Sequence, residues 1–153
     1  MKCFPCAAVL CLAALALAAG APPAGDAAAK DKAALQGTWQ SLKEEMRGGP
    51  APGDARDHRM VFTGDEFKLV DGDKVLIRGT YTVDPTKTPR AMDMKITEGA
   101  GPDPEAPAQG IYELSGDELK WCVAEPGTAG RPDKFETKGT THVLIHLKRA
   151  AAK

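Results

Sequence analysis

The fold is decided by residues 75–83, VLIRGTYTV, in which apolar and polar residues alternate without a break. Successive side chains of a β-strand point to opposite faces of its sheet, so this alternation predicts a strand with one buried and one wet face. The inward set is Val75, Ile77, Gly79, Tyr81 and Val83, and the outward set is Leu76, Arg78, Thr80 and Thr82.

The same alternation recurs on both sides of this stretch. It is found in residues 37–42, 58–63 and 67–70 before it, and in residues 91–96, 110–114, 119–123 and 141–149 after it. Short turns rich in Gly and Asp separate several of these runs, as in DGDK at residues 71–74, which is typical of β-hairpins. About eight antiparallel strands joined in sequence favour an all-β up-and-down barrel, and a two-sheet sandwich is the alternative.

Strand parity assigns a large and almost wholly apolar set of side chains to the barrel interior. The set is Trp39, Met60, Phe62, Phe67, Leu69, Val75, Ile77, Tyr81, Val83, Met92, Met94, Ile96, Tyr112, Leu114, Leu119, Trp121, Val123, Val143, Ile145 and Leu147. A barrel of eight strands holds either side chains alone or one small ligand, so both readings stay open.

The chain divides into four parts by composition. Residues 1–20 read as a signal peptide, with Lys2 before the apolar run Ala7–Ala19 and small residues suited to cleavage after Ala18 or Gly20. A buried helix and an uncleaved membrane anchor are the alternatives for this segment. Residues 21–34 read as a flexible linker, 35–149 as the barrel domain and 150–153 as a tail. The expected location is therefore outside the cytoplasm, periplasmic or secreted, with no stable membrane insertion after cleavage.

The balance of charged residues and the cysteine content limit which partners and cofactors can be expected. The 20 Lys and Arg residues balance 21 Asp and Glu residues, so no basic surplus exists to bind nucleic acid. Cys3, Cys6 and Cys11 lie in the signal segment, which leaves Cys122 alone in the exported protein. One cysteine forms neither an internal disulfide nor a cysteine-based zinc site.

No pattern in the sequence indicates catalysis. Ser41 and Ser115 lie outside any Gly-x-Ser-x-Gly motif, and most carboxylates fall in turns, where Asp supports the turn geometry. His142 and His146 lie on one expected strand, where four residues span roughly 13 Å, too far for both to bind one metal ion. The sequence therefore predicts a protein that is not an enzyme and has no cofactor or metal.

Two resemblances extend this reading. Gly37-Thr38-Trp39 on the first expected strand resembles the lipocalin and calycin pattern, in which a tryptophan closes one end of the barrel under a basic residue of the last strand. The resemblance implies that Trp39 and Arg149 form this closure. Blocks such as LQGTW at residues 35–39 and GIYELSGDELKWC at residues 110–122 are similar to a family of small exported domains expanded in planctomycete bacteria. That family implies no activity.

Two functions follow as hypotheses. The first is a carrier that holds a small hydrophobic molecule in a cavity open at the end opposite Trp39 and Arg149. Its expected ligand-binding residues are Trp39, Phe62, Tyr81, Met94, Tyr112 and Trp121. The second is a solid barrel that binds a protein or envelope partner, in the manner of an inhibitor, through the loops at residues 46–58, 98–109 and 125–139.

Overall fold

The structure, a computed structural model, describes residues 23–99, 107–125, 128 and 130–151. Within them it contains one α-helix, one short 3-10 helix and nine strands. The elements are α1 (Ala24–Leu35), β1 (Gly37–Met46), β2 (Gly49–Pro50), η1 (Ala55–Asp57), β3 (His58–Thr63), β4 (Glu66–Asp71), β5 (Lys74–Asp84), β6 (Arg90–Gly99), β7 (Ala108–Ser115), β8 (Glu118–Ala124) and β9 (His142–Arg149). The expected signal peptide lies outside the described residues.

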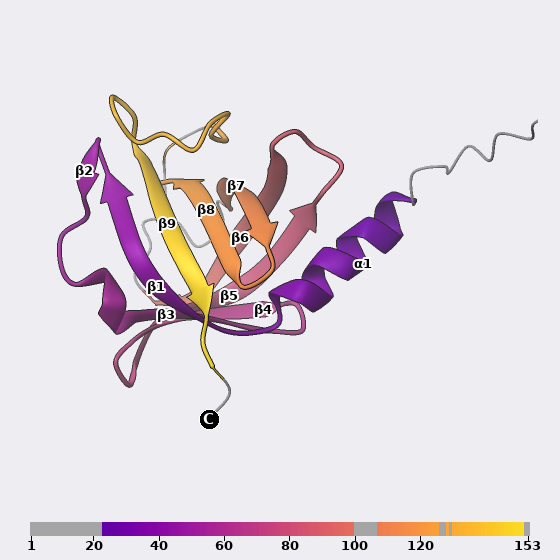
Figure 1. The fold of residues 1–153 in the computed structure, drawn as a ribbon, viewed down its shortest axis with the longest axis horizontal. Helices are drawn as coiled ribbons and strands as arrows, with labels where there is room; N and C mark the ends of the chain where they lie inside the picture. The colour runs from indigo at the N-terminus through magenta and orange to yellow at the C-terminus, as the bar shows by residue number, and fades with distance from the viewer. Residues whose placement is uncertain (1–22, 100–106, 126–127, 129, 152–153) are drawn as a thin grey trace, which may run out of the picture.

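The strands form an antiparallel up-and-down barrel, which confirms the expected fold class. The hydrogen-bonded order is β2-β1-β3-β4-β5-β6-β7-β8-β9, and β1 also pairs with β9. That pairing closes eight strands into a ring, with the short β2 added at the edge of β1 (Figure 1). Among the described residues, no helix is long and apolar enough to cross a membrane.

Register shifts break the alternation at three described strand pairings: β1 with β9, β4 with β5, and β5 with β6. The shift after Leu69 aligns Val75 with Val70, which in turn lies opposite Arg59. Val75 therefore shares the outer face with Arg59, and the expectation that it faces inward is wrong. A β-bulge adds one residue to one strand and reverses the faces beyond it, which strict parity cannot anticipate.

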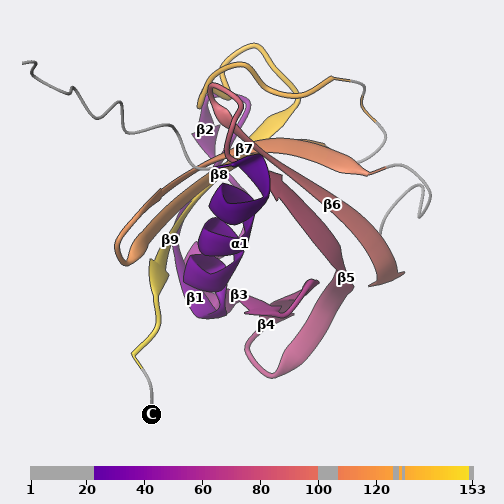
Figure 2. The same ribbon diagram turned by 90° about the vertical axis from the view of Figure 1, so that its right-hand side faces the viewer.

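Residues 24–34, expected to belong to a flexible linker, form helix α1 instead, together with Leu35, which was expected to begin the barrel domain. The segment is rich in Ala, the residue with the highest helix propensity. Asp26 in the first turn and Lys32 in the last turn each interact favourably with the helix dipole. The helix lies across one end of the ring of strands (Figure 2). We call this the capped end, and the opposite end, where β1 ends and β3 and β9 begin, the distal end.

The middle of the barrel is filled by side chains. Trp39, Phe62, Tyr81, Met94 and Tyr112 belong to one contiguous core cluster, and each is at most 2% exposed. A second, small cluster lies on the outer face, where Cys122 contacts Ile111 and Leu144 and is flanked by Phe135. Burial there raises the pKa of the Cys122 thiol to about 11, which makes it a poor nucleophile.

Candidate functional site

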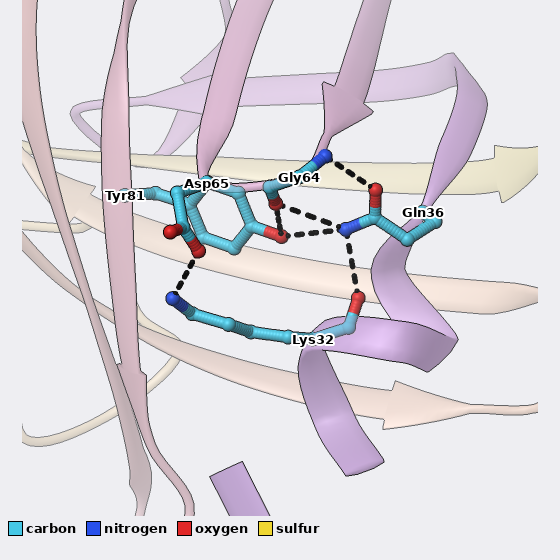
Figure 3. Close-up of polar contacts among 5 residues, drawn as sticks. All are labelled: Lys32, Gln36, Gly64, Asp65 and Tyr81. Carbon is cyan, nitrogen blue, oxygen red and sulfur yellow. Dashed lines mark hydrogen bonds and ion pairs between the residues drawn. The ribbon is translucent and has the colours of Figure 1, made fainter. Parts of the chain in front are cut away.

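The capped end is held together by side chains of α1 and of the residue that follows it. Gln36 Nε2 donates to the Tyr81 hydroxyl at 3.0 Å and to Gly64 O at 3.1 Å, while Gly64 N donates to Gln36 Oε1 at 2.7 Å. Lys32 forms an ion pair with Asp65 beside them (Figure 3). These contacts occupy the polar groups of the capped end and fix the C-terminal half of the helix.

Trp39 and Arg149 close this end of the barrel, in the arrangement expected from the sequence. The guanidinium carbon of Arg149 lies 4.3 Å from the centre of the Trp39 ring, a cation–π contact. Trp39 Nε1 donates to Leu35 O at 2.7 Å, and Arg149 donates to Gln36 O at 2.8 Å. The pair therefore ties the end of α1 to both β1 and β9.

Tyr112 also contributes a hydrogen bond to the capped end. Its hydroxyl donates to Asp31 of α1 at 2.5 Å, and Arg90 contacts the same carboxylate oxygen at 3.1 Å. Burial and the neighbouring Asp31 carboxylate raise the pKa of Tyr112 far above its usual value. Burial likewise raises the pKa of Tyr81. Both phenols therefore stay protonated. Tyr112 binds Asp31 of α1, and Tyr81 binds Gln36, the residue that follows the helix, and Gly64.

Five of the six expected ligand-binding residues are thus structural. Trp39, Phe62, Tyr81, Met94 and Tyr112 have at most 2% of their surface accessible, so no water-sized space adjoins them. Among the described residues, the structure therefore shows no cavity centred on these five side chains. Trp121, the sixth, is 8% exposed and lies in the middle of β8.

The inner wall of the distal end differs from this solid layer. Its apolar residues include Ile77, Ile96, Ala108 and Val143, which pack on the core but are only partly buried. Their register places them on the face shared with Trp121 and Ile145. These apolar side chains therefore keep some exposed surface at this end of the barrel.

A bulge in β1 adds a carboxylate to this wall. The β1–β9 register runs from Ser41 opposite Leu147 to Lys43 opposite His146, so Leu42 is the extra residue. Leu42 is 52% exposed, the one large hydrophobic side chain exposed to this degree among the described residues. Beyond the bulge Glu44 lies opposite Ile145, an inward-facing residue, and so Glu44 faces the barrel interior.

Glu44 binds two other polar side chains there. Its Oε1 accepts a hydrogen bond from the Ser41 hydroxyl at 3.0 Å and lies 2.9 Å from His58 Nδ1. Ser41 is 1% exposed, and the side chains of Glu44 and His58 are 12% and 23% exposed. The three residues form a polar cluster, which we call the Glu44 cluster, on an otherwise apolar wall. Sequence parity missed it because the bulge carries no obvious signal.

Trp121 completes the site from the opposite side. It aligns with Ile145, which in turn aligns with Glu44, so the three share one row across β8, β9 and β1. Among the described residues, Trp121 Nε1 is buried without a hydrogen-bond partner. An unpaired buried donor of this kind costs about 1–3 kcal/mol.

Trp121 keeps its position because Gly110 has no side chain. A Cβ at Gly110 would lie 2.7 Å from Trp121 Nε1 and 2.9 Å from Cys122 O. The indole therefore occupies the space over Gly110 on the inner face of β7. This orients the unpartnered N–H within the barrel interior.

Other surface features form clefts outside the interior. A cleft of about 620 Å³ lies between α1 and the turns that follow β5 and β7, with Lys30, Asp31 and Arg90 in its lining. The Asp31 carboxylate already binds Arg90 and Tyr112. Within the described part of the chain, no group of three or more His, Cys, Asp or Glu residues is placed to hold a metal ion.

Comparison with known proteins yields no family model, no curated protein and no solved structure that matches this chain. Because a barrel by itself specifies no activity, function is argued from the distal end.

Proposed function

We propose that this chain is an exported, non-enzymatic binding protein that holds a small, largely hydrophobic molecule at the distal end of its barrel. The observation that carries the proposal is the Glu44 cluster beside partly buried apolar side chains on the inner wall. Ile77, Ile96, Ala108 and Val143 are only partly buried there, whereas the layer of Trp39 and its neighbours is closed. Partly exposed apolar surface with a few polar groups beside it is typical of small-molecule sites.

The site is shallow, since only the distal part of the interior is accessible. A ligand would rest on Trp121 and Ile145 as a floor, each 8% exposed. It would not pass through the barrel, since Trp39, Arg149 and α1 close the other end.

The test is a titration of the purified protein with a neutral phenylnaphthylamine dye, which fluoresces on entering an apolar site. We expect saturable binding to the wild type. Ile96→Trp fills the distal inner wall and should abolish binding. Lys95→Trp adds the same side chain to the neighbouring exposed position, so it should leave binding intact. No saturable binding to the wild type, or equal loss in both variants, would contradict the proposal.

A second candidate is a solid barrel that binds a protein or envelope partner through the loops at residues 46–58, 98–109 and 125–139, parts of which lie outside the described residues. The filled layer of Trp39 and its neighbours favours it. Part of the third loop is also held in place, because Arg131 donates to Gly110 O at 2.6 Å and pairs with Asp93. Wild type that binds no dye but retains a protein partner would favour this candidate.

A further inference from the structure

The Glu44 cluster sets the charge of the molecule that the distal end accepts. We infer that the ligand is an amphiphilic cation, an apolar chain or ring that carries a protonated amine, and that Glu44 binds its ammonium group. This inference rests on the proposed function and adds the chemical class of the ligand to it.

The first argument is the net charge of the cluster. When Glu44 is ionised, the Glu44–His58 pair carries one negative charge if the imidazole is neutral and no net charge if the imidazole is protonated. The pair therefore never carries a net positive charge. An anionic amphiphile such as a fatty acid would place its carboxylate against Glu44 with no compensating cation. A protonated amine would supply the donor and the charge that a carboxylate favours.

The charged residues around the Glu44 cluster do not reverse the sign of its net charge. On β3 and β4, Asp71 lies opposite His58, and Lys74 lies opposite Asp71 at the exposed rim. Glu45 and Lys43, the neighbours of Glu44, pair with each other on the outer face. Opposite charges at the rim therefore offset one another, and Glu44 stays the carboxylate nearest the apolar wall.

The second argument is the apolar surface beside Glu44. Trp121 and Ile145 lie in the same row as Glu44, and each is 8% exposed. The wall therefore presents one acceptor group, the Glu44 carboxylate, next to an indole and an aliphatic side chain. An ammonium group on an apolar chain matches this surface, because the carboxylate accepts its hydrogen bonds and an indole face attracts cations.

The test compares decylamine, decanoate and decanol, which share one chain and differ in head group. Isothermal titration calorimetry below their aggregation concentrations gives a Kd for each. We expect the wild type to bind decylamine at least about tenfold more tightly than decanoate, a ratio equal to about 1.4 kcal/mol. Decanol should fall between them.

Three variants locate the preference. Glu44→Gln should reduce the amine-to-carboxylate ratio to about one while decanol affinity stays within about twofold, which shows that the site is intact. Glu44→Asp keeps the charge and should keep the preference. Glu45→Gln removes the same charge from the next residue, on the outer face, and should leave the ratio unchanged.

The outcomes separate the two proposals. If the wild type binds decanol but does not prefer the amine, the cation inference is wrong and the binding function stands. A preference that persists in Glu44→Gln also overturns the inference, because the charge would then come from elsewhere. If none of the three compounds binds the wild type, both proposals fail.

Discussion

The two ends of the barrel use the same kinds of residue in opposite ways. At the capped end, Trp39, Tyr81 and Tyr112 each have their polar atom bound to α1 or to the residue that follows it. In the middle of β8, Trp121 Nε1 has no partner among the described residues, and at the distal end Glu44 brings a carboxylate onto an apolar wall. The comparison indicates that the polar groups of the capped end hold the helix in place, whereas Glu44 sets a carboxylate beside partly buried apolar side chains.

The largest effect should come from removing the side chain that closes the capped end. Trp39 is fully buried, so we expect Trp39→Ala to lower the free energy of unfolding by about 3–5 kcal/mol. Ile96→Ala at the distal wall should cost less than half as much, because Ile96 is only partly buried. Urea denaturation followed by circular dichroism measures both. Equal losses would mean that the ends are equally packed.

Gly110→Ala should have the next largest effect and should act on the distal end. The added methyl would meet Trp121 Nε1 at 2.7 Å and Cys122 O at 2.9 Å, and such overpacking costs about 1–3 kcal/mol. The indole must move, so a change in fluorescence should accompany the loss of stability. Gly25→Ala is the matched control, since nothing lies within 4 Å of that position and alanine favours the helix.

Tyr112→Phe tests the polar contacts of the capped end and should cost about 1 kcal/mol, the worth of a typical hydrogen bond. It should also change the pH dependence. Folding raises the pKa of Tyr112, so the folded state retains its proton where the unfolded state loses it. The contribution is complete below the ordinary tyrosine pKa of about 10 and is lost as pH rises above it. The wild-type stability should therefore fall more steeply than that of Tyr112→Phe at alkaline pH, and parallel curves would exclude this linkage.

The smallest effect is expected at Leu42, the extra residue of the β1 bulge. It is 52% exposed, so Leu42→Ser should change the free energy of unfolding by no more than about 0.5 kcal/mol. Ligand binding should be unchanged, since the bulge and not the leucine turns Glu44 inward. Chemical denaturation and the dye titration check the two statements. A large loss of stability would show that Leu42 packs against something.

Strand patterning predicted the barrel, because each strand needs one buried face and period-two alternation records that requirement directly. It placed the core correctly wherever the register is regular, as at Tyr81 and Val83 on β5. Helix α1 was missed because its sequence has no apolar stripe. Its position depends on contacts with Tyr81, Tyr112 and Asp65 that lie far away in the chain.

The site was predicted only in part, for a reason of geometry. Parity assigned Trp121 to the interior, where it is found, but could not place Glu44, because the bulge at Leu42 sets the face on which Glu44 lies. The aromatic residues chosen as ligand contacts are mostly structural, because Asp31 of α1 binds the hydroxyl of Tyr112 and Gln36, just after the helix, binds that of Tyr81. The sequence alone identifies the apolar residues of a barrel, whereas the strand register determines which of those residues are exposed to solvent.

The most direct test follows the two tryptophan indole N–H signals by NMR while decylamine is added to the purified protein. The chain has two tryptophans, Trp39 at the capped end and Trp121 in the middle of β8. We predict that the Trp121 signal shifts with saturation, because its indole forms part of the floor of the proposed site. The Trp39 signal should stay in place, because its N–H is bound to Leu35 O. A shift of Trp39 alone, or no shift of either signal, would contradict the claim that the distal end is the binding site.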